Sequence, residues 1–289
     1  MEIFSDMRSR PRLALLFRRL STAALCVTLA LMLALTGPSA ARMKGMRFTN
    51  PVIEGVRVNV VLVDLNHPGI DVRPFVAGQP PFYMRNRYRS FSDLVKVTHC
   101  LAAINGTFFD PRTASVLGSM VWQGRVVHSG WVGNAVAVDA SNRAHYIRLT
   151  QPHSGSVDWS QYRFAVAAGP TLVNEGRVVV TREGEGFHDP ALFRPARRSA
   201  IGFRENGEML LVTVPRPVSL HKLARLMTRM RSTIALNLDG GSSSAMYCNG
   251  RTLVNPRRKI TNILAVLPRA SAGAGRAAMP RSAEGAAQP

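Results

Sequence analysis

Four short turns, each with a glycine between two strand-like runs, most constrain the fold of this 289-residue chain. They lie at Gln123-Gly124, Glu175-Gly176, Asn206-Gly207 and Asn249-Gly250. Asn-Gly between apolar runs is a strong short-range signal for a β-hairpin, and Asn206-Gly207 separates AIGFRE from EMLLVTV. The spacing between the turns is irregular, which argues against a solenoid. The turns therefore predict a β-rich domain built from hairpins.

Further strands and two helices are predicted around these turns. A strand over 55–65 is followed by the turn NHPG and by the strand IDVRPFVA, which we expect to pair back on it. Apolar residues at helical spacing predict helices over 91–99 and 219–230, with Ser92 and Ser219 as N-caps. Three more strands are predicted at 100–109, 233–241 and 260–268.

The N-terminus has the parts of a secretory signal. Five arginines precede an apolar run over 20–36, and Gly37, Pro38 and small residues follow it. The alternative is an uncleaved membrane anchor, but the run is short for a transmembrane span. We therefore predict a signal peptide over 1–41, cleaved after Ala41, and a periplasmic or secreted protein. Residues 42–50 are expected to be a linker, 51–268 one domain, and the small, polar residues 269–289 a disordered tail.

The chain is strongly basic, with 37 Lys and Arg against 17 Asp and Glu. Such an excess favours anionic partners, although an arginine-rich composition explains much of it. The sequence has no zinc-finger spacing, RNA-binding signature or dominant basic block, so we expect no nucleic-acid partner. Contact with a membrane is expected only through an uncleaved signal.

Two cysteines, Cys100 and Cys248, lie outside the predicted signal. In an oxidising compartment they can form a disulfide, or they can be two small buried residues. Sequence alone leaves both alternatives open, because a disulfide needs Cα atoms within about 7 Å of each other.

Polar clusters beside glycines end or begin several predicted strands, which is where ligands commonly meet sheets. The ordinary alternative is that Asn and Asp stabilise turns. Alternation along the strand after Arg197 sends Arg197 and Arg198 to opposite sides, and Arg198 is the better ligand for an anion. The clusters contain Asn105, Thr107, Asp110, Asn134, His188, Asp189, Arg198 and Asp239.

The stretch LDGGSSSAM places Asp239 at the end of a buried strand. A serine nucleophile is disfavoured, because Ala245 stands where G-x-S-x-G requires its second glycine. Gly240 and Gly241 instead allow backbone to approach a ligand, with Ser242 and Ser243 as donors. No cofactor is required by the sequence. Asp239, Asp110 and Asp189 have the oxygens that Ca²⁺ or Mg²⁺ prefers, but histidine pairs and acidic loop motifs are absent from the sequence, so a divalent cation stays an open alternative.

Six segments in this order resemble the phosphodiester glycosidase family. The resemblance implies an α/β fold of α+β type, with a mixed, largely antiparallel sheet core and a few flanking helices. Thr107 and Ser242 depart from residues common in the family, which puts the identity of the substrate in question. The segments are AINGTFF, LGSMVWQGRVVHSGWVGNAVAV, AAGPTLVNEGRVV, RRSAIGF, ALNLDGGSSSAM and ITNILAV.

The resemblance implies a hydrolase, a glycosidase that cleaves a sugar-1-phosphodiester, with N-acetylhexosamine as the suggested sugar. Together with the predicted signal, it leads us to expect an exported enzyme that acts on cell-envelope or extracellular glycans. Glycosidases commonly use two carboxylates, and Asp239 is the first candidate here. Asp110 is the preferred second one, with Asp189 as the alternative. Asn105, Thr107 and Asn134 are expected to contact the sugar, and Arg198 with the Gly240–Ser243 backbone to hold the phosphate. The competing hypotheses are a non-catalytic periplasmic binder of anionic glycans or sugar phosphates and, from charge alone, a nucleic-acid binder.

Overall fold

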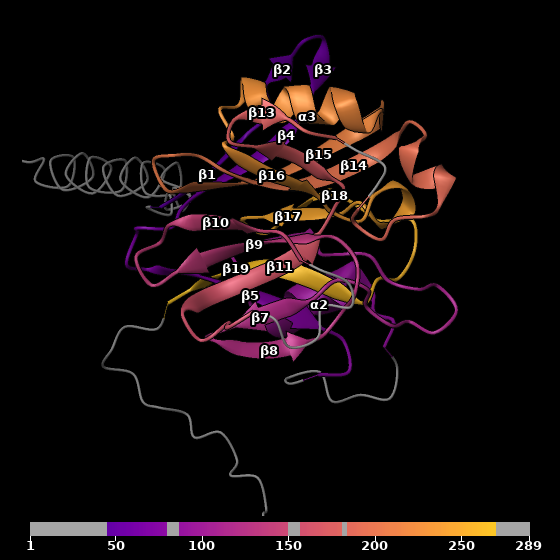
Figure 1. Cartoon of the computed structure of the whole chain (residues 1–289). Helices are drawn as coiled ribbons and strands as arrows, with labels where there is room; N and C mark the ends of the chain where they lie inside the picture. Colours follow the sequence, from indigo (N-terminus) through magenta and orange to yellow (C-terminus); the bar gives the residue numbers. More distant parts are fainter. Residues whose placement is uncertain (1–44, 80–86, 150–156, 181–183, 270–289) are drawn as a thin grey trace, which may run out of the picture. The chain divides into compact units, whose positions relative to one another are not determined.

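The computed structural model describes residues 45–79, 87–149, 157–180 and 184–269 (Figure 1). The predicted signal peptide and all but the first residue of the predicted tail therefore lie outside the described residues. Neither helix in the described part of the chain is long and apolar enough to cross a membrane.

Three antiparallel sheets form the domain. The first, in spatial order, contains β1 (Met46–Thr49), β4 (Asn59–Asp64), β15 (Glu208–Val218), β14 (Ala196–Phe203), β16 (Ile234–Asn237), β12 (Thr171–Asn174) and β13 (Arg177–Val178). The second contains β10 (Ala144–Ile147), β9 (Asn134–Asp139), β11 (Tyr162–Ala168), β7 (Met120–Trp122) and β8 (Arg125–His128). The third contains β18 (Arg251–Val254), β17 (Met246–Cys248), β6 (Ala102–Asn105), β19 (Asn262–Pro268) and β5 (Ile70–Val76), and a small hairpin joins β2 (Val52–Ile53) to β3 (Val56–Arg57).

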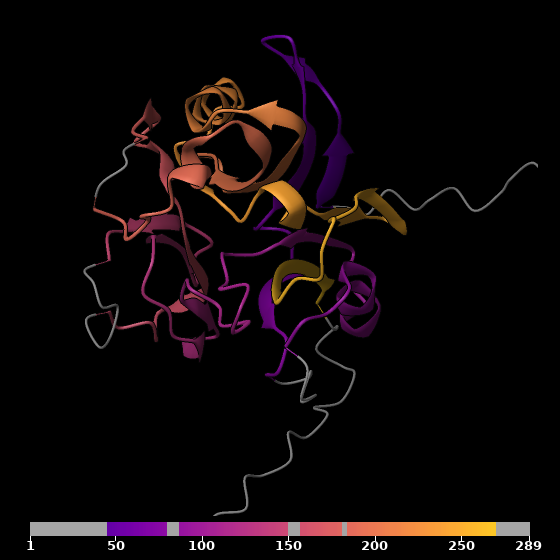
Figure 2. The same cartoon turned by 90° about the vertical axis from the view of Figure 1, so that its right-hand side faces the viewer.

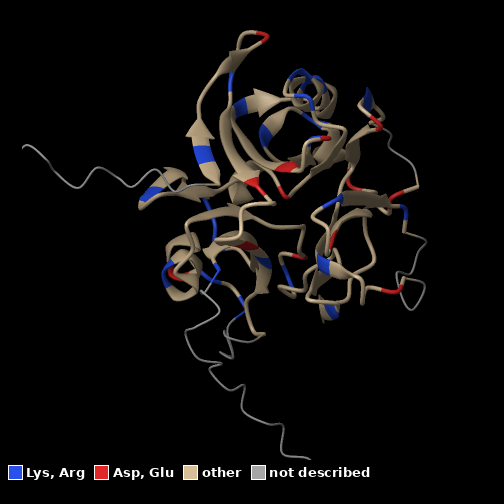
Figure 3. Ribbon diagram, turned by 90° about the vertical axis from the view of Figure 1, so that its left-hand side faces the viewer, with Lys and Arg blue, Asp and Glu red and all other residues tan. Residues whose placement is uncertain are grey.

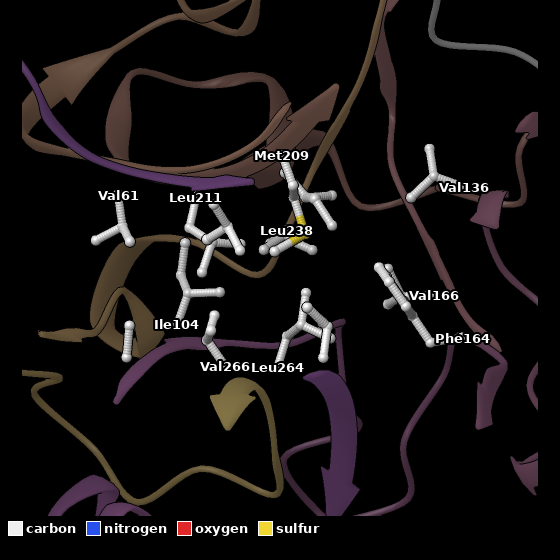
Figure 4. Close-up of a cluster of buried hydrophobic side chains, with 14 of the residues drawn as sticks. Val61, Ile104, Val136, Phe164, Val166, Met209, Leu211, Leu238, Leu264 and Val266 are labelled. Atoms are coloured by element: carbon white, nitrogen blue, oxygen red, sulfur yellow. The ribbon is translucent and has the colours of Figure 1, made fainter. Parts of the chain in front are cut away.

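The inner faces of the three sheets share one hydrophobic core (Figure 4). Along β4 the side chains alternate, so that Val61 and Val63 enter this core while Val60 and Leu62 face the other side. The shared core is built from all three sheets, with labelled members that include Val61, Ile104, Val136, Phe164, Leu211 and Leu264.

Two helices cover outer faces of the sheets, and Figure 2 views α3 end-on. Helix α3 (Leu220–Arg229) packs against β12, β13 and β16 and buries Leu223 and Met227. Its N-cap is Ser219, as predicted, because the Ser219 hydroxyl accepts the N–H of Lys222. Helix α2 (Phe91–Thr98) packs against β19 on the outer face of the third sheet.

The four predicted turns are confirmed as the connections of hairpins β7–β8, β12–β13, β14–β15 and β17–β18. The expectation of a mixed sheet in an α/β fold needs correction, because every pairing among the described strands is antiparallel and sheets dominate over helices. A β-dominated α+β fold describes the domain better.

Three local expectations were wrong. IDVRPFVA pairs with β19 and not with the preceding strand, because β4 already has β1 and β15 on its two edges. Helix α2 is capped by Ser90 and not by Ser92, since Ser90 accepts the N–H of Asp93. Residues 46–49 are strand β1 and not linker.

Of the two alternatives left open for Cys100 and Cys248, the structure has no disulfide, because both cysteines are free. Cys248 packs in the core shared by the three sheets, whereas Cys100 packs with Phe91 and Leu94 beneath helix α2. Burial raises the pKa of both thiols, to about 11 for Cys248. They are the small buried residues of the second alternative.

Lys and Arg residues are distributed over many elements of the domain (Figure 3). Part of the charge is paired locally: Glu54, on the turn between β2 and β3, meets Lys222, Arg225 and Arg229 of α3. This ion-pair cluster attaches the small hairpin to α3.

Candidate functional site

Asp239 lies where the ends of β6 and β16 meet. The N–H of Leu238 donates to the carbonyl of Ser199 on β14, and the N–H of Asp239 donates to the carbonyl of Gly106, just after β6. Two sheets therefore fix the backbone on both sides of this position. Asp239 itself is 7 % exposed.

Asn105, at the end of β6, holds this junction together. Its Nδ2 donates to the carbonyl of Asp239 at 2.6 Å, and its Oδ1 accepts from the Ser199 hydroxyl at 2.7 Å and the Ala245 N–H at 2.9 Å. Asn105 is 1 % exposed, so both ends of the amide are committed inside the protein. In this structure Asn105 positions the backbone of Asp239, and its contact with a sugar stays a prediction.

Arg258 is the ionic partner of Asp239. Arg258 Nη2 lies 3.0 Å from Asp239 Oδ2, and Arg258 Nε donates to the Ser243 hydroxyl at 2.6 Å. The guanidinium lies over the ring of Phe109, 4.4 Å from its centroid. The other carboxylate oxygen, Oδ1, accepts the N–H of Gly240 at 2.8 Å. Ser243 is fully buried against Asp239 and Arg258, which suits a donor and not an exposed nucleophile.

The pKa of Asp239 is raised because burial disfavours the carboxylate. Hydrogen bonds from Ser243 and Gly240 and the charge of Arg258 act in the opposite direction and stabilise the ionised form. A carboxylate whose pKa is perturbed by burial and by a specific charged partner, and which lies in a cavity, is a candidate functional residue.

The two glycines after Asp239 are required by local geometry. A Cβ on Gly240 would lie 2.9 Å from the Arg197 carbonyl oxygen, and Gly241 has a φ of +58°, a value that side chains disfavour. The predicted close approach therefore exists, but at Gly240 the backbone approaches another strand and not a ligand. Gly240, Gly241 and Ser242 also line an open cavity together with Asp239.

This cavity has a volume of about 600 Å³ and combines polar and aromatic walls. The polar part contains Asp239, Arg258, Arg198 and the 240–242 backbone. The aromatic part contains Phe108, Phe109, Trp131 and Phe187, and three more polar side chains that line the cavity are Asp110, His188 and Asp189.

Arg198 lines the cavity but is used differently from the prediction. Its Nε donates to the carbonyl of Val218, and its Nη2 donates to the carbonyls of Leu192 and Arg194. The side chain is 2 % exposed, and burial lowers its pKa to about 10. Arg197 reaches the other side, to the carbonyls of Ser244 and Asn255, so the expected alternation is confirmed. Arg198 thus holds the 190–194 turn, and its contact with a phosphate stays a prediction, whereas the side chain of Arg258 is 34% exposed.

The other two aspartates that line the cavity stabilise turns. Asp110 Oδ1 accepts the N–H of Arg112 at 2.7 Å, and this bond lowers the pKa of Asp110. Asp189 accepts the N–H of Ala191 and caps a short 3-10 helix, η1 (Pro190–Phe193). A lowered pKa keeps Asp110 ionised and makes it a poor proton donor at neutral pH.

Asn134 and Thr107 do not line this cavity, and their contact with a ligand stays a prediction. Asn134 belongs to a buried cluster with Thr171 and Glu185: Asn134 Nδ2 donates to Thr171 Oγ1, and both carboxylate oxygens of Glu185 accept the N–H of Thr171. Burial raises the pKa of Glu185. Thr107 is 1 % exposed, and only its backbone carbonyl is bound, by Asn262.

Arg258, Trp131 and Glu185 were not predicted. Arg258 stands in the basic run NPRRKI just before the last strand, and a basic residue beside a strand was the available signal. In the described ranges, no three His, Cys, Asp or Glu side chains gather closely enough to hold a metal ion. The guanidinium of Arg258 beside Asp239 would also repel a cation there.

Fold and site together define an antiparallel β-sheet protein with an aspartate–arginine pair in a partly aromatic cavity. The sequence model of the phosphodiester glycosidase family matches residues 98–267, which is more than half of the chain. The chain therefore belongs to the phosphodiester glycosidase family, whose name describes hydrolases.

Two curated relatives carry the name N-acetylglucosamine-1-phosphodiester alpha-N-acetylglucosaminidase. The Mus musculus protein is 26% identical over 181 residues, 57% of this chain and 35% of that protein. The Bos taurus protein is 25% identical over 188 residues, 60% of this chain and 36% of that protein. The chain thus spans about a third of the length of these relatives.

Solved structures show the same fold. The catalytic domain of the zebrafish enzyme of that name has a TM-score of 0.63 at 17% identity, with 79% of this chain and 85% of that chain covered. A hypothetical protein from Synechocystis has a TM-score of 0.62 at 20% identity, with 78% and 61% covered.

Proposed function

We propose that this chain is an exported glycosidase that hydrolyses a sugar-1-phosphodiester in cell-envelope or extracellular glycans. The observation that carries the proposal is Asp239, a buried carboxylate with a raised pKa that opens on a cavity beside Arg258. Membership of the phosphodiester glycosidase family and the names of the curated relatives support the reaction class. N-Acetylhexosamine is the first sugar to test.

In the proposed reaction the bond between the anomeric carbon and the phosphate oxygen breaks. The phosphate group leaves readily, so the enzyme mainly has to bind it and stabilise the positive charge that develops on the sugar. Arg258, with a side chain 34% exposed, is available to the departing phosphate. Ionised Asp239 stabilises the anomeric centre, as a nucleophile or as the base for the attacking water. Asp110 is the proposed second carboxylate.

The test is release of free sugar from synthetic sugar phosphodiesters by the purified protein, with Asp239→Asn as the variant. Asparagine keeps an oxygen for the Gly240 N–H but removes the charge. We expect turnover to fall by about 10²–10⁴-fold, which is typical for loss of an acid–base group. Asp158→Asn is the matched control, because Asp158 is an exposed carboxylate that does not line the cavity and whose Oδ1 accepts the N–H of Ser160 in a turn.

Two results would contradict the proposal. Wild-type protein that binds sugar phosphates but releases no sugar from any substrate would be a periplasmic binder. Equal activity of Asp239→Asn and wild type would remove Asp239 from the chemistry. Circular dichroism of the variant separates loss of chemistry from loss of fold.

A further inference from the structure

Trp131 is unusual among the aromatic side chains of the domain. It is 48 % exposed and lines the cavity that contains Asp239. A large apolar ring left open to solvent beside a polar site often marks a ligand contact. No role in the proposed chemistry requires it.

The backbone that carries Trp131 is held firmly. The N–H of Trp131 donates to the Leu117 carbonyl at 2.7 Å, and the N–H of Gly130 donates to the Ser119 hydroxyl at 2.9 Å. A Cβ on Gly130 would lie 2.2 Å from the Leu117 oxygen, so the two segments are in close contact. The exposure of the indole is therefore built into the fold and does not come from a loosely held loop.

The segment that carries Trp131 is also tied to the segment that carries Phe187. The N–H of Gly133 donates to the carbonyl of Glu185 at 2.8 Å, two residues before Phe187. The ring of Phe187 packs against that of Phe108, with centroids 5.1 Å apart. All three aromatic residues line the cavity, and we call Trp131, Phe187 and Phe108 the aromatic wall.

We propose that the aromatic wall is the subsite for the sugar ring of the substrate, with Trp131 as the main stacking surface. This inference rests on the proposed function and specifies which part of the substrate lies where. The phosphate then lies at Arg258, in the polar part of the same cavity.

A pyranose ring fits this cavity because it is amphipathic. Its C–H face is apolar and packs on an aromatic ring, while its hydroxyl groups need polar partners. Asp110, His188 and Asp189 line the same cavity and supply donors and acceptors. The alternative anionic ligand with an apolar part is an isoprenoid phosphate. Its hydrocarbon chain cannot form hydrogen bonds with these three side chains, so the cost of removing them from water would not be compensated.

The test measures binding by the full chain, without turnover. The probes are N-acetylglucosamine 1-phosphate, inorganic phosphate, geranyl phosphate and uridine monophosphate, titrated into wild type, Trp131→Ala and Trp131→Phe. We expect Trp131→Ala to weaken binding of the sugar phosphate about tenfold, or about 1.4 kcal/mol. Trp131→Phe should retain most of the affinity, and inorganic phosphate should bind all three proteins equally. Val126→Ala, which removes part of another exposed apolar side chain outside the cavity, is the control.

Four results would overturn the subsite. The first is that wild type does not bind the sugar phosphate. The second is that Trp131→Ala loses affinity for the sugar phosphate and for inorganic phosphate equally, and the third is that it loses no affinity for the sugar phosphate. The fourth is that Trp131→Ala loses affinity only for geranyl phosphate or only for uridine monophosphate. The binding test and the hydrolysis test can fail independently, so the subsite and the glycosidase activity are tested separately. A protein that binds the sugar phosphate through Trp131 but releases no sugar keeps the subsite and refutes the glycosidase activity.

Discussion

Removing the guanidinium of Arg258 tests whether the pairing with Asp239 is as important as the geometry indicates. Arg258→Met keeps an apolar stem over Phe109 but leaves the Asp239 carboxylate without its ionic partner. In the wild type the two groups are 3.0 Å apart, and their side chains are 34% and 10% exposed. The variant therefore leaves a nearly buried charge uncompensated.

The expected loss of stability at pH 7 is about 2–3 kcal/mol. A hydrogen bond to a charged group contributes about 1.5–3 kcal/mol, and removing one partner of a fully buried pair costs about 3–5 kcal/mol. Arg258 is a third exposed, so solvent screening places the loss at the lower end. In an Asp239→Asn background the same change should cost less than about 1 kcal/mol, because no carboxylate remains. The coupling energy of the double-mutant cycle is then about 2 kcal/mol.

The loss should also depend on pH in a definite direction. The folded-state pKa of Asp239 is raised above its ordinary value of 3.8, and losing Arg258 raises it further. As pH falls, the folded protein takes up a proton before the unfolded chain does. The penalty is therefore complete at neutral pH and shrinks as pH falls through the folded-state pKa.

Urea unfolding of wild type, both single variants and the double variant at pH 7 and pH 5 measures these quantities. An equal loss in both backgrounds would show that Arg258 acts through packing alone. A penalty that grows as pH falls would show that Asp239 does not carry the uncompensated charge. Either result would refute the reasoning.

Three other predictions follow from contacts in the domain. Asn105→Ala should lower the free energy of unfolding by about 2–3 kcal/mol, since it leaves several buried partners unpaired, and should reduce kcat more than it changes KM. Gly240→Ala should lower both stability, by about 1–3 kcal/mol, and activity, because its Cβ meets a carbonyl oxygen at 2.9 Å. Gly250→Ala, at a turn with open space, should lower stability only. Because Cys100 and Cys248 are free, unfolding should expose both of these thiols with or without reductant, and reductant should not change Tm.

Local signals predicted most of the elements. Three of the four predicted turns place a Gln, Glu or Asn with positive φ before a glycine, which sets the twist that a hairpin requires, as at Asn249 and Gly250. At Asn206-Gly207 only the glycine has positive φ. Helix α3 followed from one apolar face and one cap. These local signals do not determine which hairpins lie side by side in the sheets. The prediction therefore paired β5 with the strand that precedes it in the sequence, whereas in the structure β5 pairs with β19.

The site divides in the same way. The position of a polar residue at the end of a predicted strand identified Asp239. The alternation of side chains along a strand predicted that Arg197 and Arg198 point to opposite sides. Neither signal contains the partners, because these arrive from distant positions: Asn105 is 134 residues from Asp239. The prediction that Arg198 binds phosphate took no account of the Leu192 and Arg194 carbonyls, which accept hydrogen bonds from its Nη2. These partners become visible only in the folded chain.

The burial of the predicted site residues indicates how the site is built. Asn105 and Arg198 are polar residues at strand ends, which was the reason to expect them in contact with a ligand. Both are 2 % exposed or less, and in both the polar side chain makes its hydrogen bonds to other groups of the protein. Arg258 and Trp131 differ from these two residues, because part of each side chain remains exposed in the cavity after its contacts with the protein are made. Residual exposure in the cavity is therefore a further reason to propose Arg258 and Trp131 as ligand contacts, and Asp239, which is 7 % exposed, is proposed because of its position in the cavity and its partners.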